Sequence, residues 1–191
     1  MQDTYIQDQT FNKIDFTNAP LTKGEYDGCV FVNCNLADSN LAEFKFIDCT
    51  FSNCNLSLLK LHKTLFRDIT FIGCKMLGLA FDMCDAFGLS FSFNNCQLNH
   101  ASFYKTRIKK TIFKDSHLQE VDFTECDLAG AVFDDCDLTR AVFENTILEK
   151  ADLRTACNYS IDPEKNRVKK AKFSLAGLPG LLDKYDIIIE K

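Results

Sequence analysis

The sequence lacks the features that mark several common protein classes. Its 191 residues include no tryptophan, only 8 glycines and only 3 prolines, which is unusual for a helical globular domain. No apolar stretch approaches the ~18 residues of a transmembrane helix. The N-terminus, MQDTYIQDQT, has no basic region followed by an apolar run, the mark of a signal peptide. We therefore expect a cytoplasmic protein without a membrane partner.

Chemical motifs are equally scarce. The three histidines, His62, His100 and His117, are scattered, and no phosphate-binding loop, dinucleotide-binding motif or zinc-protease motif occurs. We therefore expect no catalytic residue, no cofactor and no enzymatic activity. The formal net charge of −5 disfavours a direct nucleic-acid binder. The chain is still 46% hydrophobic and 26% charged, a balance typical of a folded, soluble domain.

What the sequence does contain is a five-residue period. Steps of five from Phe11 to Phe91, and again from Leu98 to Leu153, meet a large apolar residue at 28 of 29 positions, the exception being Ala86. Neither a helix, with its period of 3.6, nor a simple strand, with its period of 2, produces this spacing. The period predicts an extended chain that turns every five residues and winds into a coil, with the apolar centres inside.

The position two residues before each centre takes small side chains, and it holds nine of the ten cysteines. These are Cys29, Cys34, Cys49, Cys54, Cys74, Cys84, Cys96, Cys126 and Cys136. Free cysteine behaves as a small buried hydrophobe, and the sequence has no cysteine pairs with further ligands of the kind that zinc requires. We therefore predict ten reduced thiols and no metal site.

Steps of twenty favour four faces per coil. They give an unbroken series from Phe11 through Phe31, Phe51 and Phe71 to Phe91, whereas steps of fifteen mix residue types. In the second run a step of ten also fits. We predict about seven coils. Seven residues separate Phe91 from Leu98, so residues 82–97 are expected to hold a phase slip. We expect a small bulge or short loop there, with the two-residue excess as a bulge at residues 92–97.

The run DLAGAVFDDCDLTRAVF (127–143) resembles the A(D/N)LxX pattern of pentapeptide-repeat proteins. The resemblance implies an all-β fold, a right-handed quadrilateral β-helix. The residues of the C-terminal tail predict a short helix and a strand in addition. We divide the chain into a β-helix at residues 1–157 and a capping and dimerisation segment at residues 158–191. Ser174 is expected to cap a helix at residues 174–184, and residues 187–189 are expected to form a strand.

The tail IDPEKNRVKKAKFSL (161–175) resembles those of the Qnr-type quinolone-resistance proteins and the McbG-type microcin immunity protein. This resemblance implies a DNA mimic that binds DNA gyrase and topoisomerase IV and protects them from quinolones or a peptide toxin. Qnr proteins of Gram-negative bacteria carry projecting loops, for which this sequence shows little room. The resemblance also implies a homodimer through the C-terminus. The implied interface residues are Phe173, Leu175, Leu178, Leu181, Leu182, Ile187, Ile188 and Ile189.

Residues 115–153 are strongly acidic, with eleven acids against Arg140 and Lys150, a net charge of −9. We expect the topoisomerase-binding surface here. Its candidate residues are Asp115, Asp122, Glu125, Asp127, Asp134, Asp135, Asp137 and Glu144. Two interpretations stay open: the acids mimic DNA, or they only keep the rod soluble. In the second case the protein is a non-catalytic interaction scaffold without a topoisomerase partner.

Overall fold

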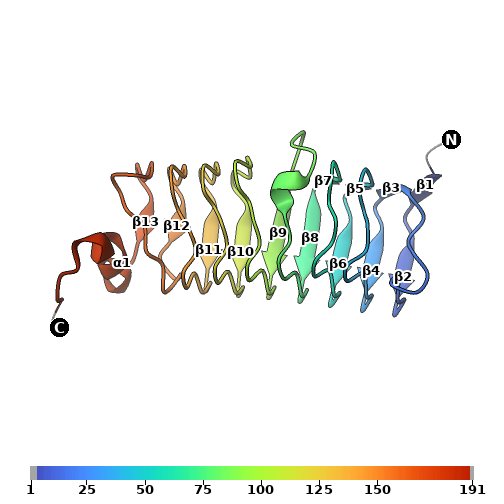
Figure 1. Ribbon diagram of the computed structural model, residues 1–191, viewed down its shortest axis with the longest axis horizontal. Coiled ribbons are helices and arrows are strands. Elements are labelled where there is room, and N and C mark those ends of the chain that lie inside the picture. The colour runs from blue at the N-terminus through green and yellow to red at the C-terminus, as the bar shows by residue number, and fades with distance from the viewer. Residues whose placement is uncertain (1–3, 190–191) are drawn as a thin grey trace.

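The computed structural model describes residues 4–189, which wind into a rod of coils stacked side by side (Figure 1). Two parallel sheets run along the rod. One contains β1 (Thr4–Gln7), β3 (Gly24–Asp27), β5 (Lys45–Ile47) and β7 (Leu65–Arg67). The other contains β2 (Thr10–Asn12), β4 (Val30–Val32), β6 (Thr50–Ser52), β8 (Ile69–Ile72), β9 (Phe91–Asn94), β10 (Ile112–Lys114), β11 (Val132–Asp134), β12 (Asp152–Leu153) and β13 (Lys172–Phe173).

The register confirms the four-sided β-solenoid. Phe11 pairs with Phe31, and Phe31 with Phe51, so one coil takes twenty residues. We number the faces in chain order. Face 1 is the nine-stranded sheet, and face 4 is the four-stranded sheet with its continuation from Arg107 to Arg167. Isolated bridges hold face 2, for example at Asn35–Asn55, and face 3, for example at Ser102–Asp122.

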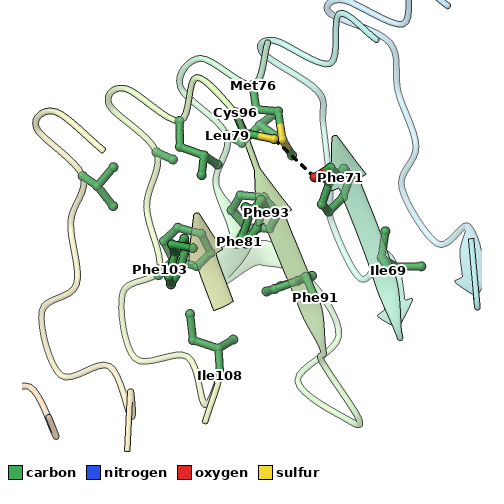
Figure 2. Packing of buried hydrophobic residues seen from close by; sticks show 14 of the residues in the cluster. Ile69, Phe71, Met76, Leu79, Phe81, Phe91, Phe93, Cys96, Phe103 and Ile108 are labelled. Atoms are coloured by element: carbon green, nitrogen blue, oxygen red, sulfur yellow. Dashed lines mark hydrogen bonds between the residues drawn. The ribbon is translucent and has the colours of Figure 1, made fainter. Parts of the chain in front are cut away.

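The core is a stack of aromatic rings. Along face 1 the rings of Phe93 and Phe113 stack at 5.1 Å, and along face 3 those of Phe81 and Phe103 stack at 4.6 Å. Rings from these opposite faces meet edge to face, as Phe81 and Phe93 do at 6.0 Å (Figure 2). Burying each such side chain contributes ~1.5–3 kcal/mol, and aromatic pairing adds about 0.5–1.5 kcal/mol. The Phe and Leu residues that recur every five positions therefore form the core.

The cysteines lie beside these rings. Eight of the nine at the small inward position are buried, and the ninth, Cys84, is half-buried. Six of these thiols point at backbone carbonyls of the preceding coil, as Cys96 Sγ does at 3.5 Å from the oxygen of Phe71 (Figure 2). Cys157 is exposed. That all ten thiols are reduced in solution stays a prediction.

The expected bulge at residues 92–97 is wrong. Ile69 pairs with Phe91 and Phe71 with Phe93, so Phe93, not Phe91, continues the ladder of face 1. The two extra residues lie in residues 82–90, which follow Phe81 in a loop that rises above the neighbouring coils (Figure 1). Phe91 and Phe93 are both buried, and either suits an inward position, which is why the five-residue step misplaced the excess.

The winding continues further than the repeat pattern predicted. β12 and β13 keep the twenty-residue step, with Leu153 opposite Phe173, and the rod has about eight turns rather than seven. The division at residue 157 stays a prediction. The outermost residues of the two predicted segments, 1–3 and 190–191, lie outside the described part of the chain.

The tail begins as expected but ends differently. Ser174 Oγ accepts a hydrogen bond of 3.1 Å from the Gly177 N–H and caps η2 (Leu175–Gly177), which α1 (Pro179–Leu182) and η3 (Asp183–Tyr185) follow. The strand expected at residues 187–189 is wrong, because residues 186–189 have no regular structure. A strand needs a neighbour for its backbone groups, and here the chain leads away from the rod (Figure 1).

Candidate protein-interaction surfaces

The outward surface is built from three residues of every five. In most repeats the residue two positions after the centre forms the corner, with positive φ, as in Asn53 at 53° and Asp135 at 49°. Its N–H donates to a carbonyl of the next coil, as the Asn53 N–H does to Ile72 at 2.8 Å. This bond fixes the corner, so outward side chains of successive coils lie in straight columns.

The eight acids expected to bind a topoisomerase occupy such outward positions on all four faces. Asp122 and Glu144 lie on face 3, Glu125 lies at the corner between faces 3 and 4, and Asp127 lies on face 4. The structure brings only the other four together. Asp134 ends β11 on face 1, Asp115 and Asp135 occupy the following corner, and Asp137 lies on face 2. We name these four residues the acidic edge.

Ion pairing separates the two sets. Three of the scattered acids face bases on adjacent coils: Glu125 lies 3.6 Å from Lys105, Asp127 lies 3.1 Å from Lys109, and Glu144 lies 3.3 Å from Lys165. Such exposed pairs contribute little to stability, but they cancel the local charge. Among residues 4–189, no member of the acidic edge forms an ion pair, although Lys114 lies opposite Asp134 in the sheet.

Within the acidic edge, Asp137 is the most firmly held. Partial burial by itself would raise the pKa of its carboxyl, but hydrogen bonds from Thr139, Asn158 and Gln119 outweigh that effect and lower the pKa to about 2. Asp134 accepts a bond of 3.1 Å from the Thr155 hydroxyl. The Asp137 carboxyl is therefore ionised at neutral pH, and hydrogen bonds fix the direction of both side chains.

The C-terminal segment presents an apolar surface at the end of the rod. A hollow of about 1030 Å³ is lined by Leu175, Leu178, Leu182, Ile187 and Ile189, together with Ala176, Pro179, Asp183 and Asp186. Ile188, beside it, is 90% exposed. Six of the eight residues expected at a dimer interface thus face outward. Phe173 and Leu181 differ, because they pack against the solenoid core.

Tyr159 seats this segment on the rod. Its ring lies 5.8 Å from that of Phe173 and beneath the two glycines of the segment. A β-carbon on Gly177 would lie 1.9 Å from the Tyr159 hydroxyl, and one on Gly180 would lie 2.2 Å from the Tyr159 carbonyl oxygen. The Ile161 N–H also donates to Gly180 at 2.9 Å. The seat therefore requires glycine at both positions.

The loop at residues 82–90 was missed as a candidate surface. Phe87 at its tip is 74% exposed, and the Arg67 guanidinium lies 5.8 Å from the ring centre. Met83 is also exposed. The signal that marks the loop is Ala86, the one small residue among the expected centres, followed by Phe87 and Gly88. Gly88 adopts a φ of 71°, which favours glycine.

The described residues contain neither a metal site nor a membrane-spanning helix. Between residues 4 and 189, no three His, Cys, Asp or Glu side chains gather closely enough to hold a metal ion. No helix in that range combines the length and hydropathy of a membrane span.

Comparison with solved structures finds the same architecture elsewhere. A trypsin-treated variant of QnrB1, a plasmid-mediated fluoroquinolone resistance protein, is 16% identical with a TM-score of 0.76, covering 98% of this chain and 92% of that one. Full-length QnrB1 is 15% identical with a TM-score of 0.50, over 96% and 100% of the two chains. At these identities the likeness concerns the fold. No curated protein matches the sequence.

Family models agree with the register of the coils. The model described as a pentapeptide repeat region matches residues 89–156, and the one described as pentapeptide repeats (8 copies) matches residues 29–68. Residues 69–88, which include most of the loop, lie between the two matches. Together with the twenty-residue coil and the buried centres, these matches show that the chain belongs to the pentapeptide-repeat family.

Proposed function

We propose that this protein is a non-catalytic DNA mimic of the cytoplasm that binds a type II topoisomerase, DNA gyrase or topoisomerase IV, and protects it from quinolones or a peptide toxin. The acidic edge is the observation that carries the proposal. It is a group of exposed (Asp115 and Asp135) and half-buried (Asp134 and Asp137) carboxylates without ion pairs in the described residues, held on adjacent coils of a straight rod. Its role is competition at a surface that otherwise receives DNA.

The charge density of the acidic edge suits this role. Two adjacent coils span ~10 Å at ~4.8 Å each. Four carboxylates offset by Lys114 give about one net negative charge per ~3 Å, close to the ~3.4 Å per charge of one DNA strand. The acids on faces 3 and 4 add little, because Glu125, Asp127 and Glu144 are paired with bases. The proposed mimicry is therefore local to one edge.

The fold shared with QnrB1 supports the rod shape that this mechanism needs. The target enzyme comes from the resemblance of the tail to Qnr-type proteins. We also propose a homodimer through the C-terminal apolar surface, which would double the length of the rod and present two acidic edges.

The test is a gyrase supercoiling assay with and without ciprofloxacin, combined with direct binding at low salt. The variant Asp115→Asn, Asp134→Asn, Asp135→Asn removes three charges from the acidic edge. Asn tolerates the left-handed corners, so the fold should persist. The matched control, Asp8→Asn, Asp38→Asn, Asp48→Asn, makes the same charge change at left-handed corners elsewhere. We expect the edge variant to lose at least tenfold in gyrase affinity and the control to bind like the parent.

The competing function is an interaction scaffold with no topoisomerase partner. The ion pairs that neutralise Glu125, Asp127 and Glu144 favour it, because they make this part of the acidic segment an ordinary solvated surface. Absence of gyrase binding by the parent at low salt would leave this function standing. Equal binding by the parent and the edge variant would remove the acidic edge from the interface.

A further inference from the structure

One face of the rod carries the opposite charge from the chain as a whole. It consists of face 4 in the C-terminal half and its corner with face 1, and we name it the basic face. It holds seven bases and two acids, a net charge of +5 in a chain whose net charge is −5. The bases are Arg107, Lys109, Lys110, Lys150, Arg167, Lys169 and Lys170, and the acids are Asp127 and Glu149.

The corner of the basic face is a straight column of four residues: Lys110, Gly130, Lys150 and Lys170. Their φ values are 59°, 71°, 59° and 60°. The Lys110 N–H donates to Ala129 at 3.0 Å, and the Lys150 N–H donates to Lys169 at 3.0 Å, so the column keeps the coil register. The three lysines span three coils, ~14 Å, and all three are exposed.

Both acids of the basic face are already engaged. Asp127 lies 3.1 Å from Lys109, and Glu149 lies 2.7 Å from Arg167. Within residues 4–189, the other five bases form no ion pair with a carboxylate. The basic face therefore presents five cations that are free to meet an external anion.

A hollow deepens this surface at its N-terminal end. It has a volume of about 500 Å³ and is lined by Lys105, Arg107, Lys109, Glu125, Asp127 and Ile147. Lys105 and Lys109 are paired with the two acids in it, which leaves the guanidinium of Arg107 as its uncompensated charge. A guanidinium suits the planar, two-point recognition of a phosphate.

We propose that the basic face binds the phosphate backbone of duplex nucleic acid without sequence preference. The five free cations are spread along ~14 Å of the rod, and a duplex offers one phosphate charge per ~1.7 Å of its axis. None of the outward side chains of the basic face is aromatic, so the base stacking by which proteins hold single strands is missing. Acids on the far faces act weakly here, because charges beyond the Debye length of ~10 Å are largely screened. The proposal is independent of any topoisomerase.

The test is fluorescence anisotropy of a labelled 30-base-pair duplex with the full chain, from ~20 to 200 mM salt. For five phosphate contacts, the slope of log K against log salt should be about −4.5. The variant Lys110→Asn, Lys150→Asn, Lys170→Asn should weaken binding at least tenfold and reduce the slope by about 3. Asn suits the left-handed corners, so circular dichroism should be unchanged.

The matched control is Lys13→Asn, Lys63→Asn, Lys75→Asn, which makes the same charge change in the N-terminal half. Lys13 and Lys63 also occupy left-handed corners, and Lys75 continues a column that already contains Asn35 and Asn55. The control should bind DNA like the parent. No binding by the parent at ~20 mM salt, or equal weakening in the two variants, overturns the proposal. So does binding of polyglutamate but not DNA, which would indicate an acidic protein partner.

Discussion

Most corner residues, two positions after a buried centre, are left-handed, and those other than glycine have φ values between 48° and 62°; Met83 and Thr155 are among the exceptions. This left-handed conformation costs most residues ~1–2 kcal/mol, whereas Asn, Asp and Gly adopt it more readily. Asn33, Asn53 and Asp135 fit their corners for this reason. Leu58 does not: its φ is 59°, and its side chain is 60% exposed.

We therefore expect Leu58→Asn to stabilise the protein by up to ~1 kcal/mol. The exposed leucine contributes little burial, and its replacement relieves backbone strain. Urea unfolding monitored by circular dichroism measures the change. The control is Ile72→Asn, at a similarly outward position in β8, where extended backbone favours isoleucine and the same substitution should destabilise. A loss of stability in Leu58→Asn would show that its contacts outweigh the strain.

The buried thiols make stability depend on pH at the alkaline end. Burial raises the pKa of Cys49, Cys126 and Cys136 to about 12 from an ordinary value of 9.0. The unfolded chain therefore loses these protons first. Their contribution to stability is complete below about pH 9 and is lost as the pH rises toward 12. We expect the free energy of unfolding to fall between pH 9 and 11, by up to ~1.4 kcal/mol per pH unit for each thiol.

The measurement is urea unfolding at several pH values under reducing conditions. The variant Cys49→Ala, Cys126→Ala, Cys136→Ala keeps a small residue of the kind already present at Ala131 and Ala151, the same position in other repeats. It should show a shallower fall with pH, whatever its stability at pH 7. An equally steep fall in this variant would assign the pH dependence to lysines and tyrosines instead.

At the scale of elements, the sequence predicts the repeated coils but not the loop and the tail that interrupt them. The five-residue step identified the core, because burial acts on every centre in the same way. It misplaced the loop, because Phe91 and Phe93 are both acceptable inside the coil. The strand expected at residues 187–189 failed because β-structure depends on a neighbouring strand. The acidic edge was hidden for a similar reason: which acids find a base depends on residues about twenty positions away.

The seat of the C-terminal segment gives a prediction at the same scale. In Gly180→Ala, the new β-carbon meets the carbonyl of Tyr159 at 2.2 Å, backbone that cannot move aside cheaply. We expect the segment to detach, residues 174–189 to be cleaved at least tenfold faster by protease, and the rod to stay folded. Tyr159→Phe is the control, because it removes a hydroxyl that has no hydrogen-bond partner in the described residues and should leave protection intact. Unchanged protection in Gly180→Ala would contradict this role for the seat.

At the scale of the whole molecule, the apolar end of the rod is the proposed site of assembly. Leu175 is 85% exposed and Ile188 is 90% exposed, and exposed apolar clusters of this kind mark interaction sites. We expect Leu175→Lys, Ile188→Lys to convert a homodimer into a monomer by light scattering. Its folding stability should change by less than ~0.5 kcal/mol, because both side chains are on the surface.

The control for assembly is Ile112→Lys, an exposed apolar position in β10 that lies three strands away from β13 in the nine-stranded sheet and should remain dimeric. Deleting residues 174–191 should also give a monomer. A dimer that survives both the double substitution and the deletion would place the interface elsewhere on the rod.

The length of the rod can change only in whole coils of twenty residues. Every buried ladder repeats after twenty residues, so a segment inserted between the loop and the C-terminal end keeps the register only if it forms whole coils, each adding ~4.8 Å. The loop at residues 82–90 contains the two residues that exceed a whole coil. Phe71 and Phe93, on either side of the loop, still pair with each other. Extra residues at this point therefore lengthen the loop. They leave the length of the rod, and the distance from its first coil to its C-terminal apolar surface, unchanged.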